Sequence, residues 1–465
     1  MTSMNWSFQA INQALQPHLI SAEVSDQGVI THIQTDSRQV KAGDLFVCLR
    51  GERFDAHEFA PAVIEAGAAG LVVERPLDIP VAQWIVKDTR LALGALAAEW
   101  RRGFDLPVLG VVGSNGKTTS KEMLAAICSA HCGADHVLVT QGNLNNEIGV
   151  PLTLFRLRAN HQMAVVEMGM NHPGEIAYLA SLVQPDVVLL TNAQREHQEF
   201  MKSVKAVAEE NGQAFGALPE EGCAVFPAGT DFDSLWLGMN KGSRFYRFGR
   251  GGDCWFNAGQ APDGSLVLES PLGSVDIRPS FVGEHNRSNA SGAAAAAIAA
   301  GCTIDDVRQG LEAFQPVWGR MQVVKNDGEM LLINDAYNAN PDSVNAAIQV
   351  LSTLPSPTLL VLGDMGEVGD QSVAFHQEVG ENARNSGIDK LFALGTATKA
   401  SVKSFGADGR HFSELDELLT EIMLLTSQQR WSVLVKGSRF MKMERVVDAF
   451  ASQKTVNHGG AAHVA

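Results

Sequence analysis

The sequence lacks a long apolar run, a cysteine spacing typical of a metal site, and an excess of positive charge. Its longest run of small apolar residues, 293–300, is too short to cross a bilayer. Residues 1–10 contain neither the basic nor the apolar region of a signal peptide. The six cysteines are scattered and form no zinc pattern, which is typical of free thiols in a reducing compartment. We therefore expect a cytoplasmic protein without membrane insertion.

The charge balance excludes one large class of partner. The chain has 36 lysines and arginines against 52 aspartates and glutamates, a net charge of −16. A nucleic-acid partner requires a basic surface, so we expect none. At 465 residues and 45% hydrophobic composition, the chain is long enough for two to four globular domains.

The most informative stretch is residues 107–120, with the sequence PVLGVVGSNGKTTS. A short β-branched segment leads into a loop with two glycines, and a segment compatible with a helix follows. Backbone N–H groups of such a loop surround phosphate oxygens, while Lys117 reaches the terminal phosphates and Thr118 offers a hydroxyl to Mg²⁺. Val111 stands where the usual motif has its first glycine. We expect ATP or GTP to bind at Gly113, Ser114, Asn115, Gly116, Lys117, Thr118 and Thr119.

Periodicity divides the chain into three segments, 1–87, 88–316 and 317–465. The first mixes short strands with a helix at 59–66. The second and third alternate short apolar strands with helices, the pattern of a doubly wound parallel sheet. Residues 242–280 are rich in glycine and predict an antiparallel excursion. The fold class is therefore α/β, with two α/β domains flanking a nucleotide in a cleft that can close.

Two residues that follow predicted strands are candidate metal ligands. Glu167 ends the strand predicted at 163–168, and His197 follows the strand predicted at 186–191. Because carboxyl ends of parallel strands meet at one edge, both residues are expected beside the phosphate loop, where they could share a metal ion with Thr118. The alternative for Glu167 is an exposed acid at the end of a strand, and His197 taken alone would more often be a surface histidine.

Polar loops supply further candidates. Asn143, Asn145 and Asn146 fall within four positions, which favours amide recognition of a polar ligand over plain turn chemistry. Arg320 precedes the first strand of the third segment, and residues 335–341 follow that strand. A plain loop role is as compatible with their positions as a role in the cleft.

With these motifs collected, the chain closely resembles the Mur ligases, which build the peptide of bacterial peptidoglycan precursors. The resemblance covers nearly the whole chain in order. Besides the phosphate loop and Gly319–Arg320, it rests on the stretches 36–38, 51–57 and 283–289. It implies a small N-terminal α/β domain for a UDP-sugar-peptide, a central ATPase domain with a phosphate loop, and a C-terminal Rossmann-like domain for the incoming amine.

The resemblance also implies a reaction and its residues. ATP and Mg²⁺ are the expected cofactors, and the product is an amide formed through an acyl phosphate. Lys117, Glu167, His197 and Arg320 are expected to be catalytic, with Asn286, Asn289 and Asp335 joining the ATP site. We expect substrate binding at Ser37, Arg38, Asp55, His57, Asn143, Asn145, Asn146, Tyr337, Asn338 and Asn340.

Within the family, the stretches 143–151, 337–341 and 362–369 resemble members that add D-alanyl-D-alanine to UDP-N-acetylmuramoyl-tripeptide. The Asp-Asn-Pro-Arg signature of diaminopimelate-adding members is absent. A diaminopimelate- or lysine-adding ligase, a folylpolyglutamate synthase and a phosphate-loop switch protein are the alternatives. A switch protein would not need a large domain on each side of its nucleotide site. We expect a monomer, and the third residue of the accepted peptide stays open.

The chain departs from the family at Asn211. Most Mur ligases carry a lysine here, and its carbamate helps to hold a second Mg²⁺. Lys205 and Lys202 do not share the helix face of Asn211 and cannot replace it. We expect a site without a carbamate, independent of bicarbonate, with Glu167 and His197 as the main protein ligands of the second metal. The amide of Asn211 would take part in its hydrogen-bonded or water-linked shell, and Glu209 or Glu210 could supply charge.

Overall fold

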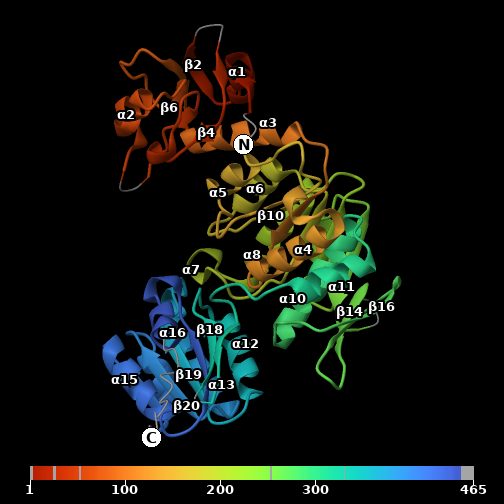
Figure 1. Ribbon diagram of the computed structural model, residues 1–465, viewed down its shortest axis with the longest axis vertical. Coiled ribbons are helices and arrows are strands. Elements are labelled where there is room, and N and C mark those ends of the chain that lie inside the picture. Colours follow the sequence, from red (N-terminus) through yellow and green to blue (C-terminus); the bar gives the residue numbers. More distant parts are fainter. Residues whose placement is uncertain (1–3, 25–27, 52–53, 252–253, 329, 452–465) are drawn as a thin grey trace, which may run out of the picture.

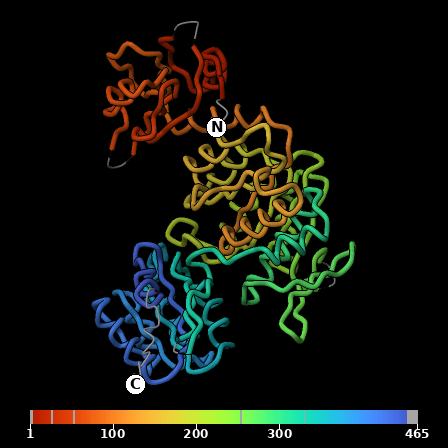
Figure 2. Tube along the Cα trace, in the orientation of Figure 1, coloured from red at the N-terminus to blue at the C-terminus, as the bar shows by residue number. Residues whose placement is uncertain are grey.

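The computed structural model describes residues 4–24, 28–51, 54–251, 254–328 and 330–451. Figure 1 shows three bodies arranged along the longest axis of the molecule, each built on its own sheet. The chain passes from the N-terminal body to the central body and then to the C-terminal body (Figure 2). The predicted α/β class with three domains is confirmed. No helix in the described ranges is long and apolar enough to span a membrane.

The N-terminal domain is a mixed sheet with the strand order β2-β7-β6-β5-β4, in which only β2 runs antiparallel to its neighbour. Helix α1 covers one face, where Leu15 packs with Trp84, and α2 covers the other, where Val63 packs with Phe46. The elements are β1 (Trp6–Ser7), α1 (Phe8–Leu15), β2 (Leu19–Glu23), β3 (Val29–Ile30), β4 (Ile33–Gln34), β5 (Leu45–Val47), α2 (Ala60–Glu65), β6 (Gly70–Val73) and β7 (Ala82–Val86).

Helix α3 (Thr89–Arg102) joins this domain to the next. Asp88 is its N-cap residue. The Asp88 carboxylate accepts hydrogen bonds from the N–H groups of Arg90 and Leu91 at 2.8 and 3.2 Å and so satisfies donors of the first turn. Leu93 and Leu96 are fully buried in a core that contains residues of both domains. The helix therefore fixes the N-terminal domain to the central one.

The central sheet has the order β16-β15-β14-β13-β12-β11-β8-β10-β9 among the described residues. Its elements are β8 (Val108–Val112), α4 (Lys117–Cys132), β9 (Val137–Val139), α5 (Gly149–Leu154), β10 (Met163–Glu167), α6 (Glu175–Val183), β11 (Val187–Leu190), α7 (Gln198–Met201), α8 (Val204–Gly212), β12 (Cys223–Pro227), α9 (Asp233–Met239), β13 (Arg244–Gly249), β14 (Phe256–Gln260), β15 (Leu266–Ser270), β16 (Gly273–Ile277), α10 (Glu284–Ala299) and α11 (Ile304–Ala313).

Strand β8 is buried on both faces, which explains its continuous apolar sequence. Val108 and Val112 pack toward α3, α5 and α6, whereas Leu109 and Val111 pack toward α4, α10 and α11. The strand lies between β10 and β11 and runs parallel to both. The carboxyl ends of these three strands therefore meet at one edge, where doubly wound sheets bind ligands.

The antiparallel excursion predicted for 242–280 is only partly correct. Strands β15 and β16 are antiparallel, but β13 pairs with β12, and β14 with β13, in the parallel direction. Exposed residues on β13, such as Arg244 and Phe245, hid its place between β12 and β14, because they interrupt the continuous apolar pattern expected of a strand inside a parallel sheet.

The C-terminal domain has a second open sheet, ordered β17-β18-β22-β19-β20-β21, with only β17 antiparallel. Helices α12 and α13 cover one face, and α15 and α16 the other. The elements are β17 (Gln322–Asn326), β18 (Met330–Asp335), α12 (Pro341–Ser352), β19 (Thr358–Gly363), α13 (Ser372–Asn385), β20 (Lys390–Leu394), α14 (Lys399–Phe405), β21 (Gly409–Phe412), α15 (Leu415–Thr426), β22 (Trp431–Lys436) and α16 (Glu444–Ala451).

Candidate active site

The phosphate loop joins β8 to α4 in a conformation that requires its glycines. Gly113 and Gly116 have φ angles of 126° and 81°. A Cβ atom on Gly113 would lie 2.2 Å from the hydroxyl oxygen of Thr191, and one on Gly116 would lie 2.4 Å from Oδ1 of Asn289. The loop therefore closes against its neighbours and presents the N-terminus of α4, a site suited to anions.

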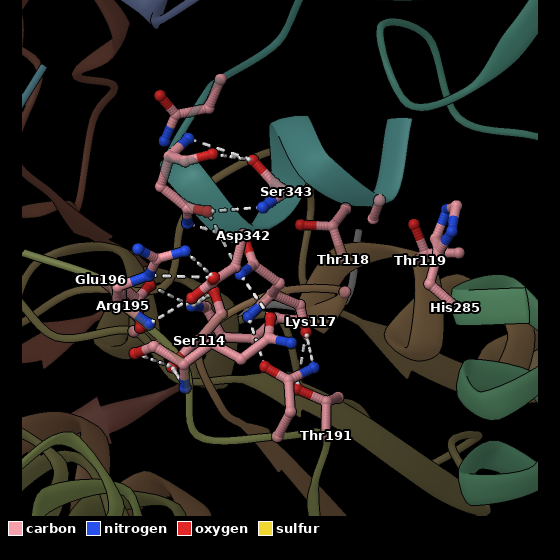
Figure 3. Close-up of a pocket in the computed structure, with 18 of the residues that line it drawn as sticks. Ser114, Lys117, Thr118, Thr119, Thr191, Arg195, Glu196, His285, Asp342 and Ser343 are labelled. Carbon is pink, nitrogen blue, oxygen red and sulfur yellow. Dashed lines mark hydrogen bonds and ion pairs between the residues drawn. The ribbon is translucent and has the colours of Figure 1, made fainter. Parts of the chain in front are cut away.

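Lys117 begins α4 and folds back over the loop. Its Nζ donates to the carbonyls of Gly113 and Ser114 at 2.5 and 3.1 Å and lies 2.9 Å from Oε1 of Glu196. Figure 3 shows Lys117, Ser114 and Glu196 grouped on one side of the pocket. The ammonium group thus compensates a carboxylate that is 8% exposed.

Glu167 ends β10 and is 1% exposed. Its Oε1 accepts hydrogen bonds from the hydroxyl of Thr118 at 3.2 Å and from the amide of Asn145 at 2.8 Å. Its Oε2 is buried and has no hydrogen-bond partner. The structure therefore brings three of the predicted site residues together, with one carboxylate oxygen left to receive a cation.

His197 lies just before α7 at the same edge of the sheet, as expected from the strand order. Its Nε2 is 3.6 Å from Oε1 of Glu196, and its Nδ1 is 2.6 Å from Oε2 of Glu367 in the C-terminal domain. This contact with His197 lowers the pKa of the Glu367 carboxyl. Glu367 therefore fixes the orientation of the imidazole and leaves Nε2 directed toward Glu196.

The C-terminal domain contributes the cation of Arg320 and the buried ion pair of Asp335 and Lys436 to the site. The Arg320 guanidinium stacks 4.3 Å from the centroid of the Tyr337 ring. Asp335 ends β18 and uses both carboxylate oxygens: one accepts the Met321 N–H at 3.0 Å, and the other contacts Nζ of Lys436 at 2.6 Å. Asp335 and Lys436 are 9% and 3% exposed, so the pair is largely buried.

Direct contacts join the central and C-terminal domains beside the phosphate loop. The Asn340 side chain begins α12 by accepting the Ser343 N–H at 2.8 Å, and its amide donates to Oδ1 of Asn115 at 2.9 Å. Two polar side chains predicted from separate loops therefore bond across the domain boundary.

Arg195 forms a larger contact, which we call the arginine latch. Its Nε donates to Asp342 at 3.0 Å, and its terminal nitrogens donate to Glu378 at 2.7 and 2.8 Å. Figure 3 shows Arg195 and Asp342 linked by dashed lines. The hydrogen bonds with Glu378 and Asp342 raise the pKa of Arg195, and the same contact lowers the pKa of Glu378. The latch holds α12 and α13 against the central domain.

These groups surround one cavity of about 810 Å³, large enough for a nucleotide and part of a second substrate. Both α/β domains line it. The predicted residues that line it are Ser114, Asn115, Gly116, Lys117, Thr118, Thr119, Asn143, Asn145, Asn146, Glu167, His197, Asn286, Asn289, Arg320, Asp335, Tyr337, Asn338 and Asn340.

The predicted residues of the N-terminal domain do not line this cavity. Ser37 and Arg38 lie in a short 3-10 turn, where the Arg38 guanidinium donates to Asp36 at 2.7 and 2.8 Å. This pair lowers the pKa of Asp36. The Arg38 side chain is exposed, and its bonds to Asp36 fix the orientation of its guanidinium. Its contact with a substrate stays a prediction.

His57 is buried, and its ring contacts other groups of the N-terminal domain. Its Nδ1 lies 2.5 Å from Asp55, and its Nε2 accepts the Glu74 N–H at 2.9 Å. Although burial raises it, hydrogen bonds from His57 and Arg75 bring the pKa of Asp55 down to about 2. Both ring nitrogens of His57 are thus engaged within the domain. Residues 52 and 53 of the predicted 51–57 stretch lie outside the described residues.

Asn211 does not take the place in a metal shell expected from the sequence. Its amide oxygen accepts the Gly113 N–H at 2.8 Å, its amide nitrogen donates to the Val207 carbonyl, and it is 1% exposed. Glu210 accepts the N–H groups of Gly174 and Ile176, both at 2.9 Å. Both side chains therefore accept hydrogen bonds from backbone N–H groups. Asn211 stabilises the phosphate loop, and Glu210 stabilises the start of α6.

Sequence reasoning missed four charged residues that shape the site: Arg195, Glu196, Glu367 and Lys436. Glu196 and Arg195 directly precede His197, so a search of the whole loop after β11 could have found them. Lys436 ends a buried strand and pairs with Asp335 from the neighbouring strand, which the sequence does not reveal. Glu367 meets His197 only because the two domains touch.

The site fits a magnesium ion by the chemistry of its donors. Glu167 and Glu196 each leave a buried carboxylate oxygen without a partner, and Thr118 adds a hydroxyl. In the described part of the chain, no three histidine, cysteine, aspartate or glutamate side chains are gathered closely enough to hold a metal alone. Mg²⁺ usually binds through one or two carboxylates plus substrate phosphates, which matches this arrangement.

Comparison with known proteins agrees with this geometry. Residues 29–101 match the description "Mur ligase family, catalytic domain", residues 111–297 match "Mur ligase middle domain", and residues 319–439 match "Mur ligase, glutamate ligase domain". The chain belongs to the Mur ligase family, a class of ATP-dependent ligases.

Similar relatives within the family share one activity in their names. The UDP-N-acetylmuramoyl-tripeptide–D-alanyl-D-alanine ligase of Escherichia coli is 42% identical over 91% of this chain and 94% of its own length. The crystal structure of MurF from Acinetobacter baumannii has a TM-score of 0.90 at 36% identity, covering 97% of this chain and 100% of that one. MurF from Thermotoga maritima in complex with ADP has a TM-score of 0.81 at 26% identity, covering 90% and 97%.

Proposed function

We propose that this protein is an ATP-dependent ligase that joins D-alanyl-D-alanine to UDP-N-acetylmuramoyl-tripeptide in cytoplasmic peptidoglycan precursor synthesis. The name that the relatives share supports the two substrates, and one observation of the structure supports the ATP-dependent chemistry. A phosphate loop on the central sheet and a loop of polar residues on the C-terminal sheet face each other across a single cavity. ATP bound to the first loop would thus lie between the central domain and the C-terminal domain.

The first half-reaction activates the carboxylate. A terminal carboxylate oxygen of the tripeptide attacks the γ-phosphorus of ATP. The bond from that phosphorus to the β,γ-bridging oxygen breaks, so that ADP is released and an acyl phosphate is formed. Lys117 and Arg320 approach the phosphates from opposite domains and offset the charge that gathers there. Mg²⁺, held by Thr118 and Glu167, would neutralise further phosphate charge.

The second half-reaction forms the amide. The amine nitrogen of D-alanyl-D-alanine attacks the acyl carbon and loses a proton, the bond from carbon to the phosphate oxygen breaks, and phosphate leaves. An acyl phosphate is also open to hydrolysis, so water must be excluded while the amine arrives. The arginine latch and the contact of Asn340 with Asn115 hold the C-terminal domain over the phosphate loop and favour this protection.

Measuring release of ADP with the UDP-tripeptide, with and without D-alanyl-D-alanine, tests the proposal. The expected result is full turnover only when both are present, with the amide product seen by mass spectrometry. Equal or faster turnover with diaminopimelate, lysine or glutamate as the amine would contradict it in favour of another ligase. Slow hydrolysis of nucleotide unaffected by any amine would favour a switch protein.

A further inference from the structure

Lys121 is a lysine buried close to the phosphate loop, and the reaction as described does not use it. It lies on α4, about one helical turn after Lys117, and its side chain is fully buried. Lysine is almost never fully buried unless its charge is paired, because removing an ammonium group from water is costly. We therefore looked for the contacts that keep this charge in the interior.

The ammonium group of Lys121 has one partner near the surface and one in the interior. Its Nζ lies 2.5 Å from Oε1 of Glu122, whose side chain is 38% exposed. It also donates to the main-chain carbonyl of Thr140 at 2.8 Å, and Thr140 is 1% exposed. A hydrogen bond from a charged donor is roughly twice as strong as one between neutral groups. The interior contact therefore ties α4 to the residue that directly follows β9.

Thr140 connects Lys121 to Glu167. Its hydroxyl accepts the main-chain N–H of Glu167 at 3.0 Å, across the parallel pair of strands β9 and β10. Thr118, three residues before Lys121 on the same face of α4, donates to the Glu167 carboxylate. Helix α4 therefore holds Glu167 at two points: Thr118 contacts its side chain, and Lys121 fixes its backbone through Thr140.

The loop of asparagines begins at the same contact. Residues 141–148 follow Thr140 and include Asn145, whose amide donates to the Glu167 carboxylate at 2.8 Å. The carbonyl that Lys121 holds is thus the point from which this loop leaves the sheet. One buried ammonium group therefore fixes both the backbone of Glu167 and the start of the loop that contacts its side chain.

We propose that Lys121 is a positioning residue for the ATP-dependent step. By holding Thr140, it sets the direction of the Glu167 carboxylate, which would hold Mg²⁺, and the start of the loop of asparagines. A displacement of about 1 Å in such groups can lower a rate by about two orders of magnitude. The inference rests on the proposed function only in that Glu167 faces the Mg²⁺ of bound ATP.

Hydrogen exchange of the chain without ligands tests the positioning directly. Lys121→Met keeps most of the side-chain volume and removes the charge. Peptides covering 140–148 and 163–169 should exchange at least about tenfold faster in this variant by mass spectrometry, and a peptide covering β11 should not change. The matched control is Glu122→Gln, which keeps an oxygen beside Nζ and should leave all three rates unchanged.

Kinetics then separate positioning from stability. At a temperature at which circular dichroism shows the variants folded, Lys121→Met should raise the Mg²⁺ concentration for half-maximal turnover about tenfold and lower kcat by a similar factor. The KM for D-alanyl-D-alanine should stay unchanged, because the C-terminal domain is untouched. Thr140→Val removes the hydroxyl that accepts the Glu167 N–H and should have the same effects, whereas Thr140→Ser keeps it and should behave as the wild type.

Three results would overturn the proposal. Exchange that rises equally in β11 would mean that Lys121 only stabilises the domain, and unchanged exchange and Mg²⁺ dependence would mean that it has no role in the site. If Lys121→Met fails to fold, the two Thr140 variants decide, and an equal Mg²⁺ dependence of both contradicts the proposal. If the exchange pattern is as expected but the wild-type chain forms no amide, only the proposed function is refuted.

Discussion

The central and C-terminal domains are both built on open, mostly parallel sheets whose carboxyl edges line the same cavity, yet the buried carboxylates at the two edges have different partners. At the central edge, Glu167 and Glu196 each leave an oxygen without a partner. At the C-terminal edge, Asp335 fills both oxygens with the Met321 N–H and Lys436. The first edge can receive cations and phosphates, whereas the buried carboxylate of the second edge is already neutralised within its own domain.

This difference explains how one fold performs two tasks in one protein. A strand followed by a tight glycine loop exposes backbone N–H groups, and a strand followed by an aspartate and asparagines exposes side chains. The central edge therefore binds charge that comes and goes with each turnover. The C-terminal edge keeps its shape and carries Arg320 and Tyr337 to the cavity.

The largest effect on stability should come from breaking the Asp335–Lys436 ion pair at the carboxyl edge of the C-terminal sheet. Lys436→Met leaves Asp335 buried without its cation, which should destabilise the C-terminal domain by about 3 kcal/mol or more. Urea unfolding followed by intrinsic fluorescence measures this. Lys399→Met, at an exposed position, should have little effect. If Asp335→Ala combined with Lys436→Met is no more stable than Lys436→Met alone, the pair is not the cause.

At the central edge, removing a cation should damage turnover rather than folding. Lys117→Ala should lower turnover at least about a hundredfold, the scale of losing one electrostatic stabiliser of the transition state. The variant should still fold, but its melting temperature should fall because Glu196 is left buried without its cation, so turnover is measured at a temperature at which circular dichroism shows the variant folded. Lys205→Ala is the exposed control. Turnover near normal would contradict the assignment.

Removing the arginine latch, which holds the C-terminal domain against the central domain, should have a smaller effect on activity. Arg195→Ala removes charged hydrogen bonds to Asp342 and Glu378, and should reduce kcat/KM roughly tenfold by letting the domains part. Small-angle scattering with nucleotide should show a more extended molecule than the wild type. Arg308→Ala, which loses contacts to two carboxylates within α11, should change neither. Identical scattering profiles for all three proteins would refute the latch.

The N-terminal domain should respond to a different substrate. Arg38→Ala should raise the KM for the UDP-tripeptide about tenfold, because a guanidinium suits diphosphate oxygens, and should leave the KM for ATP unchanged. Steady-state kinetics with each substrate varied measures the two values. Arg90→Ala removes a similar pairing with a nearby aspartate and serves as the control. A rise in both KM values would indicate that Arg38 is structural.

The smallest expected effect is that of pH on the arginine latch. The pKa of Glu378 is lowered by Arg195 from the ordinary value of 4.5, so its ionised form stabilises the closed arrangement at neutral pH. That contribution is lost only as pH falls through the lowered value. Scattering should therefore be constant from about pH 8 to about pH 5 and change only below the ordinary glutamate range. An opening already at about pH 6 would contradict it.

Much of the site was predictable because its motifs are local. The phosphate loop has a short motif, and placing Glu167 and His197 after two successive strands of a parallel sheet sufficed to expect them at one edge, although β8 lies between those strands. Asn211 shows the limit. Its substitution for a lysine was recognised, but its hydrogen bond to Gly113 depends on how α8 packs under β8.

The sequence by itself determined the α/β class, three domains, the phosphate loop and the family, because glycine turns, hydrophobic periodicity and short motifs act over a few residues. Only the tertiary structure decided which charges meet. Glu196 with Lys117, Asp335 with Lys436, and His197 with Glu367 are pairs separated by 79 or more residues. Such pairs follow from the crossing of strands and the docking of domains, and in the first two pairs burial makes each charge depend on the one opposite it.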